Sequence, residues 1–116
     1  MEILVNYEEI TMQLILHGGN ARGLAYEALD EAEEYQFDKA ERLLEEAQGE
    51  FLKGHQYQTK LIQKEDDGQV PNFFMIHAQD HVMTAQAELQ LIKRLVAQLK
   101  REEALDKRIK KLEEGK

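Results

Sequence analysis

The stretch that decides the fold is residues 73–99, FFMIHAQDHVMTAQAELQLIKRLVAQL. Apolar residues recur in it at alternating spacings of three and four. A helix with this spacing presents a continuous apolar seam to neighbouring helices. Pro71 suits the first turn of the helix, which we expect to run to about Leu99 or beyond. The seam consists of Met75, Ala78, Val82, Ala85, Leu89, Ile92, Val96 and Leu99.

Two further helices are predicted upstream. Asn6 with Glu9, and Asp38 with Glu41, have the spacing of a capping box, in which an N-cap side chain and a glutamate satisfy the first backbone N–H groups. The first helix should end near Glu34, and its glycine pair, residues 18–19, should weaken or bend it. The expected core residues are Ile10, Leu14, Ala21, Leu24, Ala28 and Ala32 in the first helix, and Leu43, Leu44, Ala47, Phe51, Leu61 and Ile62 in the second.

The connections between these helices are short. Only residues 35–37 separate the first two, which predicts an antiparallel hairpin. Residues 65–70, acidic and with one glycine, form the loop before the third helix. A chain of 116 residues with one proline and no runs rich in β-branched residues is typical of a single all-α domain, 1–116. We therefore expect an antiparallel, up-down-up three-helix bundle of the spectrin-like kind.

The formal net charge of −8 argues against a nucleic-acid-binding protein, because phosphate backbones require basic surfaces. Residues 101–116 form a charged C-terminal tail. Its thin apolar stripe, Leu105, Ile109 and Leu112, permits a helix, although we expect the tail to be mobile. The rest of the chain is strongly acidic, which favours a protein partner with a positive surface.

Several classes of site are excluded by composition. The chain has no cysteine, so disulfides, thiolate catalysis and cysteine-based zinc sites are absent, and no serine is present to act as a nucleophile. No signal-peptide pattern opens the chain, and no apolar stretch approaches 18 residues. These features predict a cytoplasmic protein that does not insert into membranes.

The third helix carries a second apolar stripe nearly opposite the first. A monomeric bundle has no use for it, so we expect self-association through this face. Asp80 interrupts the stripe, and copies related by a symmetry axis would bring these carboxylates together, where a shared proton or a hard cation would compensate them. An exposed, harmless Asp80 is the alternative. The stripe consists of Phe73, Ile76, Met83, Ala87 and Leu91.

Between the two apolar faces lies a polar face with His77, His81, Thr84 and Glu88, and on the other side Gln79 belongs to a face expected to be solvated, together with Gln86, Gln90 and Lys93. A neutral imidazole in a groove beside a subunit boundary suits covalent phosphoryl transfer.

Two other interpretations of the histidines remain open at this stage. His77 and His81 have the spacing of zinc ligands on a helix, but residue 78 is alanine rather than the glutamate base of zinc proteases. A third ligand would have to come from His17 or His55, whose roles the sequence does not assign. The other interpretation is a non-catalytic helical adaptor in which the histidines are incidental.

The run Ile76–Thr84, IHAQDHVMT, resembles the phosphorylation-site motif of the lactose/cellobiose-type IIA components of the bacterial phosphoenolpyruvate-dependent sugar phosphotransferase system (PTS). The resemblance extends to residues 18–22 (GGNAR), 37–40 (FDKA) and 55–59 (HQYQT), and covers about residues 5–100. Val82 stands where leucine is common in the family.

The resemblance implies a homotrimer of three-helix subunits, nine helices in all. It implies that His77 accepts a phosphoryl group from the carrier protein HPr and passes it to a cysteine of the IIB component, with only indirect contact to IIC. Asp80 would share a structural divalent cation, usually magnesium (Mg2+), with its two symmetry mates on the trimer axis. Gln79 and His81 would be accessory residues. Ala78 favours, weakly, the cellobiose or diacetylchitobiose branch over the lactose branch.

Overall fold

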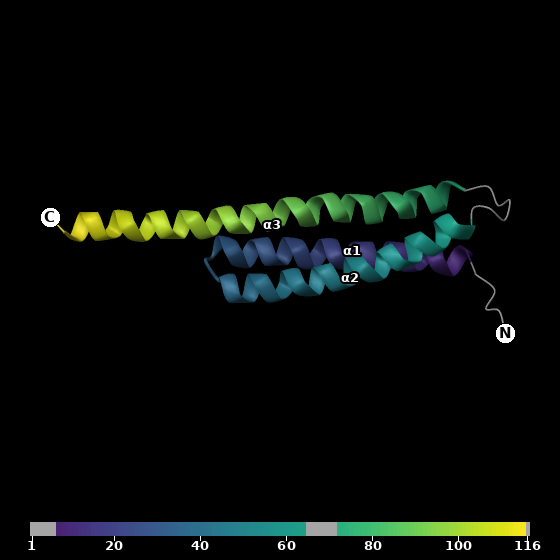
Figure 1. The fold of residues 1–116 in the computed structure, drawn as a ribbon, viewed down its shortest axis with the longest axis horizontal. Coiled ribbons are helices and arrows are strands. Elements are labelled where there is room, and N and C mark those ends of the chain that lie inside the picture. Colours follow the sequence, from purple (N-terminus) through teal and green to yellow (C-terminus); the bar gives the residue numbers. More distant parts are fainter. Residues whose placement is uncertain (1–6, 65–71, 116) are drawn as a thin grey trace.

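The computed structural model describes residues 7–64 and 72–115, and these form three helices: α1 (Tyr7–Glu33), α2 (Phe37–Lys64) and α3 (Phe73–Glu114). Figure 1 shows α1 and α2 side by side as a hairpin, with α3 running along them in the direction of α1. The C-terminal part of α3, in yellow, projects beyond the hairpin. The described residues contain no strand, so the predicted all-α fold is confirmed.

The turn between α1 and α2 depends on Tyr35, which adopts the left-handed conformation with φ of 60°. Its N–H donates to the carbonyl of Ala32 and the next N–H donates to Glu31, both at 2.9 Å. These two bonds form a Schellman motif, which closes a helix C-terminus. The chain enters α2 directly after it, at Phe37. Asp38 therefore lies in the first turn of α2. The prediction that it is the N-cap of this helix was wrong.

The N-cap of α3 is Asn72, whose side-chain oxygen accepts a hydrogen bond from the Met75 N–H at 2.8 Å. Asparagine is among the preferred N-cap residues because its oxygen satisfies one of the free N–H groups of the first turn. The predicted cap at Asn6, the predicted loop at 65–70 and Pro71 lie outside the described residues.

The core follows the predicted seam of α3. All of its members are buried except Leu99, which packs against the core at its edge. In α1 the predicted residues are buried except for the half-buried Leu24, and Ala25 joins them. In α2, Ile62 is 56% exposed, so its assignment to the core was wrong. Four alanines of α1 are fully buried, and such small side chains let helix axes approach closely: Ala21, Ala25, Ala28 and Ala32.

The glycine pair does not interrupt α1, which continues through residues 18–19. Gly18 lies against the backbone of His81 on α3, and Gly54 of α2 lies close to the Cβ of His17 and to Val82. The three helices therefore make a close crossing at the level of His81, where two of them contribute a residue without a side chain.

The segment expected to be a tail is the last part of α3. The helix continues without a break to Glu114, well past the hairpin turn, where the Tyr35 hydroxyl donates to Glu102 at 3.1 Å. The helical character of this segment is confirmed, and its mobility stays a prediction. The twelve residues from Glu103 to Glu114 form a free overhang about 18 Å long.

Candidate phosphoryl-transfer site

His77 and His81 form a pair on the first half of α3. Their Nε2 atoms are 3.2 Å apart, and the rings meet edge to face with centroids 4.7 Å apart. The i, i+4 spacing places both rings on one side of the helix. His77 is exposed, whereas His81 is partly covered. The pair therefore presents one accessible imidazole that a second imidazole orients.

The contact between the two rings has the length of one hydrogen bond, and the tautomers decide which ring donates. A hydrogen bond between two Nε2 atoms needs one ring to donate and the other to accept, so both histidines can be neutral while they are bonded. A neutral imidazole has a free lone pair on one nitrogen and is a nucleophile. The contact fixes the ring plane of His77, and when His81 is the donor it occupies the Nε2 lone pair of His77 until a phosphoryl donor displaces it.

The same polar face continues to Glu88, which is tied to α1. The Nε of Arg22 donates to a carboxylate oxygen of Glu88 at 2.6 Å. This hydrogen bond, with the negative charge of Glu88, raises the pKa of Arg22 above its usual value. Thr84, between His81 and Glu88, is exposed. The ion pair joins α1 to the face that carries the histidines.

Gln79 lies on the other side of α3, toward α2. Its side-chain oxygen accepts a hydrogen bond from Gln58 at 2.6 Å, and the same Gln58 nitrogen lies 3.5 Å from the sulfur of Met83. Residues two apart on a helix do not face each other, so Gln79 does not reach His77 within one subunit. Gln79 and Lys93, which bonds Gln48 at 2.7 Å, contact α2, so this face is only partly solvated. The buried Gln58 was not singled out from spacing, although it lies in the HQYQT run.

The second apolar stripe is exposed on the surface of the subunit, as its pattern predicted. Phe73 is 85% exposed, and Ile76, Met83 and Leu91 are each more than half exposed. Asp80 lies among them, also exposed. In the described part of the chain no other carboxylate or histidine gathers with Asp80 into a group of three metal ligands.

The remaining histidines are placed elsewhere. His17 donates from Nδ1 to Glu50 at 2.6 Å and stacks on Tyr57, with ring centroids 5.9 Å apart. The hydrogen bond from His17 lowers the pKa of the Glu50 carboxyl, an effect that burial partly opposes. His55 is exposed on α2 beside Phe51. Neither is brought to the His77–His81 pair as a third metal ligand within the described residues, so the zinc interpretation gains no support.

None of the three helices that the structure describes has both the length and the hydrophobicity needed to cross a membrane.

The sequence is similar to the lichenan-specific phosphotransferase enzyme IIA component of Bacillus subtilis (strain 168). The two are 45% identical over 80 residues, which cover 67% of this chain and 73% of that protein.

Solved structures show the same fold. The cellobiose-specific PTS enzyme IIA of Bacillus anthracis superposes with a TM-score of 0.81 at 36% identity, covering 88% of this chain and 95% of that one. The IIA(chitobiose) protein of Escherichia coli, solved in complex with HPr, gives a TM-score of 0.77 at 31% identity, covering 86% of this chain and 99% of that one. Residues 9–100 match the family described as PTS system, lactose/cellobiose specific IIA subunit. With its helices, its histidine pair and these relatives, the chain belongs to the lactose/cellobiose-specific IIA subunits of the sugar phosphotransferase system.

Proposed function

We propose that His77 is the residue that carries the phosphoryl group, received from HPr and passed to a cysteine of the IIB component. The observation that carries this proposal is the exposed His77 ring held edge to face by His81. The E. coli relative solved with HPr supports the choice of donor. A carrier of this kind works in the cytoplasm, where both partners are available to it.

The chemistry requires little of the protein beyond positioning. The bond between phosphorus and the nitrogen of the donor's phosphohistidine breaks as the bond to a His77 nitrogen forms, and the donor nitrogen keeps the electron pair. In the second transfer a cysteine thiolate attacks, the bond between phosphorus and nitrogen breaks, and a bond between sulfur and phosphorus forms.

His81 has a defined task in this scheme. When Nε2 of His77 bonds to phosphorus, the hydrogen bond that this nitrogen accepts from the Nε2–H of His81 is lost and that N–H becomes free. It can then donate to a phosphoryl oxygen, which carries the charge that His77 has received. His81 therefore orients the nucleophile before the transfer and stabilises the phosphorylated form afterwards.

We also propose that three of these up-down-up subunits assemble as a homotrimer through the exposed apolar stripe of α3. Burying such side chains stabilises association by about 25 cal/mol per Å2 of apolar surface. Three Asp80 carboxylates would then converge, and their oxygen ligands suit Mg2+. When bound there, the cation would neutralise the repulsion between the carboxylates. It has no part in phosphoryl transfer.

A cyclic trimer gives Gln79 a place near the reaction. His77 lies on one flank of the stripe and Gln79 on the other, and neighbouring copies around an axis bring opposite flanks together. Gln79 of one subunit would therefore approach His77 of the next, while Gln58 keeps its amide oriented. This arrangement makes Gln79 an accessory residue that acts across the subunit boundary.

The described part of the structure contains no feature that identifies the transported sugar, so its class is inferred from similar proteins. Similar proteins are named for lichenan, cellobiose and diacetylchitobiose, and others of about the same similarity are named for galactose and lactose, so these names alone do not choose the sugar. We propose a β-disaccharide system, with the cellobiose or diacetylchitobiose branch, which Ala78 favours, over the lactose branch. The sugar meets IIC, which this chain would contact only indirectly.

The test of the proposed function uses the purified chain with phosphoenolpyruvate, enzyme I and HPr. One acid-labile phosphate per chain is expected, and His77→Gln should abolish it. The matched control is His55→Gln, which removes an exposed histidine of α2 and should leave labelling intact. Labelling that survives His77→Gln would assign the carrier role to another residue. An unlabelled wild-type chain would favour the adaptor interpretation.

A further inference from the structure

The overhang of α3 has an apolar face without a partner in the subunit. Leu105, Ile109 and Leu112 are each more than half exposed, and Leu112 is 72% exposed. Figure 1 shows that neither α1 nor α2 reaches this part of the helix. An amphipathic helix of about 18 Å that protrudes from a domain needs a partner for its apolar side.

This face continues the second apolar stripe and not the core seam. At about 100° per residue, Leu91, Leu95 and the three apolar residues of the overhang fall within about 100° of arc on the same side as Asp80. The core seam, extended by the same spacing, becomes polar and reaches Glu103, Asp106 and Lys110. In the overhang, the side that continues the core seam is therefore polar. The side that continues the second apolar stripe, which we propose packs between subunits, remains apolar.

The charges beside the stripe are arranged for a parallel partner. From Leu95 onward the positions on this side have alternating spacings of three and four, as in a coiled coil. Two of them are polar, and one of these, Glu102, accepts a hydrogen bond from Tyr35 of its own subunit. The positions are Leu95, Gln98, Glu102, Leu105, Ile109 and Leu112. One flanking position of each heptad holds Arg101 and Arg108, and the other holds Asp106 and Glu113. In a parallel coiled coil the first flank of one helix meets the second flank of its neighbour five residues further on. Both pairs, Arg101 with Asp106 and Arg108 with Glu113, are then attractive.

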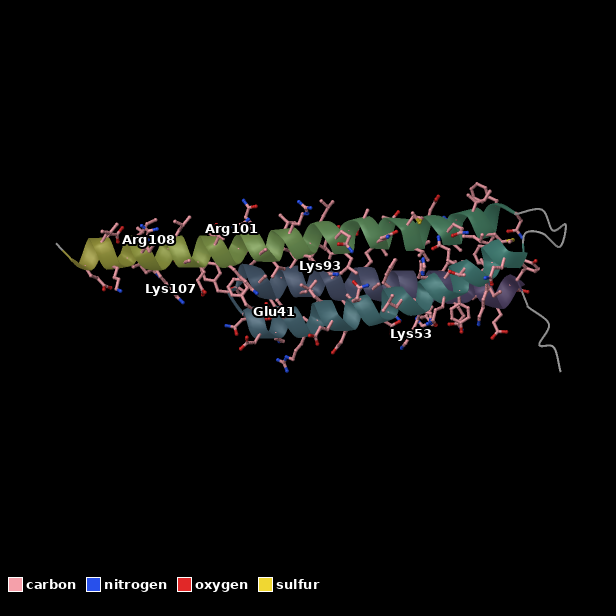
Figure 2. All side chains as sticks on the ribbon, viewed as in Figure 1. Glu41, Lys53, Lys93, Arg101, Lys107 and Arg108 are labelled. Atoms are coloured by element: carbon pink, nitrogen blue, oxygen red, sulfur yellow. The ribbon has the colours of Figure 1, made fainter. Side chains whose placement is uncertain are left out.

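An antiparallel arrangement brings together flanks of the same kind, arginine with arginine and carboxylate with carboxylate. The arrangement of charges therefore favours a second copy of this helix as the partner, and a parallel orientation of the two helices. Figure 2 shows Arg101 and Arg108 on the exposed surface of α3. Among the described residues neither arginine has a carboxylate within ion-pair distance, whereas Lys107 and Lys110 pair within the helix with Glu103 and Asp106.

We propose that the overhang and the two residues before it, 101–114 in all, pack in parallel with the same segment of other copies of this chain. They form a short coiled-coil stalk that extends the oligomer beyond the bundle. The inference rests on the proposed self-association through α3 and deepens it, because it assigns a role to a segment beyond residue 100, where the family match ends.

A membrane surface is the less favourable partner. Anionic lipids attract helices whose polar face is strongly basic. Residues 100–114 carry six Lys/Arg and five Asp/Glu, so their net charge is close to zero. The flanking charges are also segregated by sign, which serves pairing between helices and not attraction to a uniformly negative surface.

The test measures self-association of the full chain by sedimentation equilibrium. The variant Arg101→Glu with Arg108→Glu makes both proposed pairs repulsive, and the concentration at which the oligomer half-dissociates should rise by about tenfold or more. The matched control, Lys107→Glu with Lys110→Glu, changes the net charge equally and disrupts two pairs within the helix, but lies away from the second apolar stripe. Its half-dissociation concentration should stay within about twofold of the wild type. Adding Asp106→Arg and Glu113→Arg to the first variant should restore association.

Orientation is tested with single cysteines, since the chain has none of its own. Leu112→Cys should form a disulfide between copies readily under mild oxidation, because residue 112 meets itself in a parallel pair. Lys111→Cys, one position outside the second apolar stripe, should not. Fast crosslinking of Lys111→Cys and none of Leu112→Cys would overturn the proposal.

These measurements distinguish the proposed stalk from the proposed trimer of the bundle. An oligomer whose dissociation is the same for wild type, the arginine variant and the lysine control overturns the stalk and leaves the trimer of the bundle in place. A chain that is monomeric at every concentration overturns both, and the labelling of His77 is measured independently of either. Binding to vesicles with anionic lipid that requires Leu105 and Leu112, with self-association unchanged by the arginine variant, would assign the face to membranes instead.

Discussion

The backbone of His81 lies directly against Gly18. A Cβ built on Gly18 would be 3.2 Å from both the carbonyl carbon and the carbonyl oxygen of His81, and 3.4 Å from its Cβ. Backbone atoms cannot rotate out of the way as a long side chain can. The absence of a side chain at residue 18 therefore allows α1 to approach closely the segment of α3 that carries the histidine pair.

Gly18→Ala should destabilise the subunit by about 1 kcal/mol. Alanine is better than glycine inside a helix by about 1 kcal/mol, but overpacking a rigid contact costs about 1–3 kcal/mol. The control is Gly19→Ala, where an added Cβ meets nothing within 4 Å and a stabilisation of about 0.5–1 kcal/mol is expected. Urea unfolding of the two variants checks the prediction. Equal stabilisation by both would show that α1 and α3 can separate at no cost.

His81→Phe should slow phosphorylation of His77 by about tenfold, because it keeps a ring beside His77 but removes the nitrogen that contacts it. One hydrogen bond to a charged group corresponds to roughly 1.5–3 kcal/mol, which is about tenfold or more in rate. His81→Gln, which retains an N–H donor, should recover part of the lost rate. Rapid-quench labelling with phosphorylated HPr measures both.

The alternative outcomes for residue 81 are clear. If the phenylalanine and glutamine variants are slowed equally, His81 acts by packing and the donated hydrogen bond is irrelevant. If neither is slowed, the contact between the rings is incidental to transfer.

The sequence predicted what depends on local periodicity. The seam from Met75 to Val96 is buried because its spacing leaves one side of α3 apolar along its length, whatever the neighbours are. The exposed stripe with Asp80 was predictable for the same reason. The pairing of His77 with His81 follows from the geometry of a helix alone.

Features that depend on how the helices pack were missed. Gln79 was assigned to solvent, although Gln58 of α2 bonds it, because periodicity does not say which flank of α3 lies beside α2. Asp38 was assigned as an N-cap because the sequence does not reveal that Tyr35 takes the left-handed conformation. Ile62 is apolar yet exposed, since it lies on the outer side of α2. Each error reflects a tertiary contact and not a local propensity.

Glu50→Gln should destabilise the subunit near neutral pH and have less effect in acid. The hydrogen bond from His17 lowers the pKa of Glu50 below 4.5, so the folded state binds fewer protons there than the unfolded state. The stabilisation is present above about pH 4.5 and is lost as the pH falls through the folded pKa. At pH 7 the loss should be about 1 kcal/mol.

The measurement for Glu50 is urea unfolding at pH 7, 5 and 3, for wild type and variant. The difference between them should shrink toward pH 3. Glu46→Gln serves as the control, because Glu46 is exposed, and should change stability by less than about 0.5 kcal/mol at each pH. A difference that is constant with pH would mean that the carboxylate charge of Glu50 does not contribute.

Asp80→Leu should preserve or strengthen the proposed trimer and make its assembly insensitive to chelators. Asp80 is flanked along the stripe by Ile76 and Met83, so convergence of three copies places like charges in apolar surroundings, and leucine removes the repulsion while it extends the stripe. Sedimentation equilibrium is measured in about 1 mM magnesium, a concentration chosen to saturate a carboxylate site, and in excess EDTA. Wild type should dissociate more readily in EDTA, and the leucine variant should behave alike in both buffers. Asp30→Leu, on the exposed side of α1, is the control and should keep the wild-type response to EDTA. Dissociation of Asp80→Leu in magnesium, at concentrations where wild type stays assembled, would mean that the contacts between carboxylates and metal hold the trimer together and do more than offset their own repulsion.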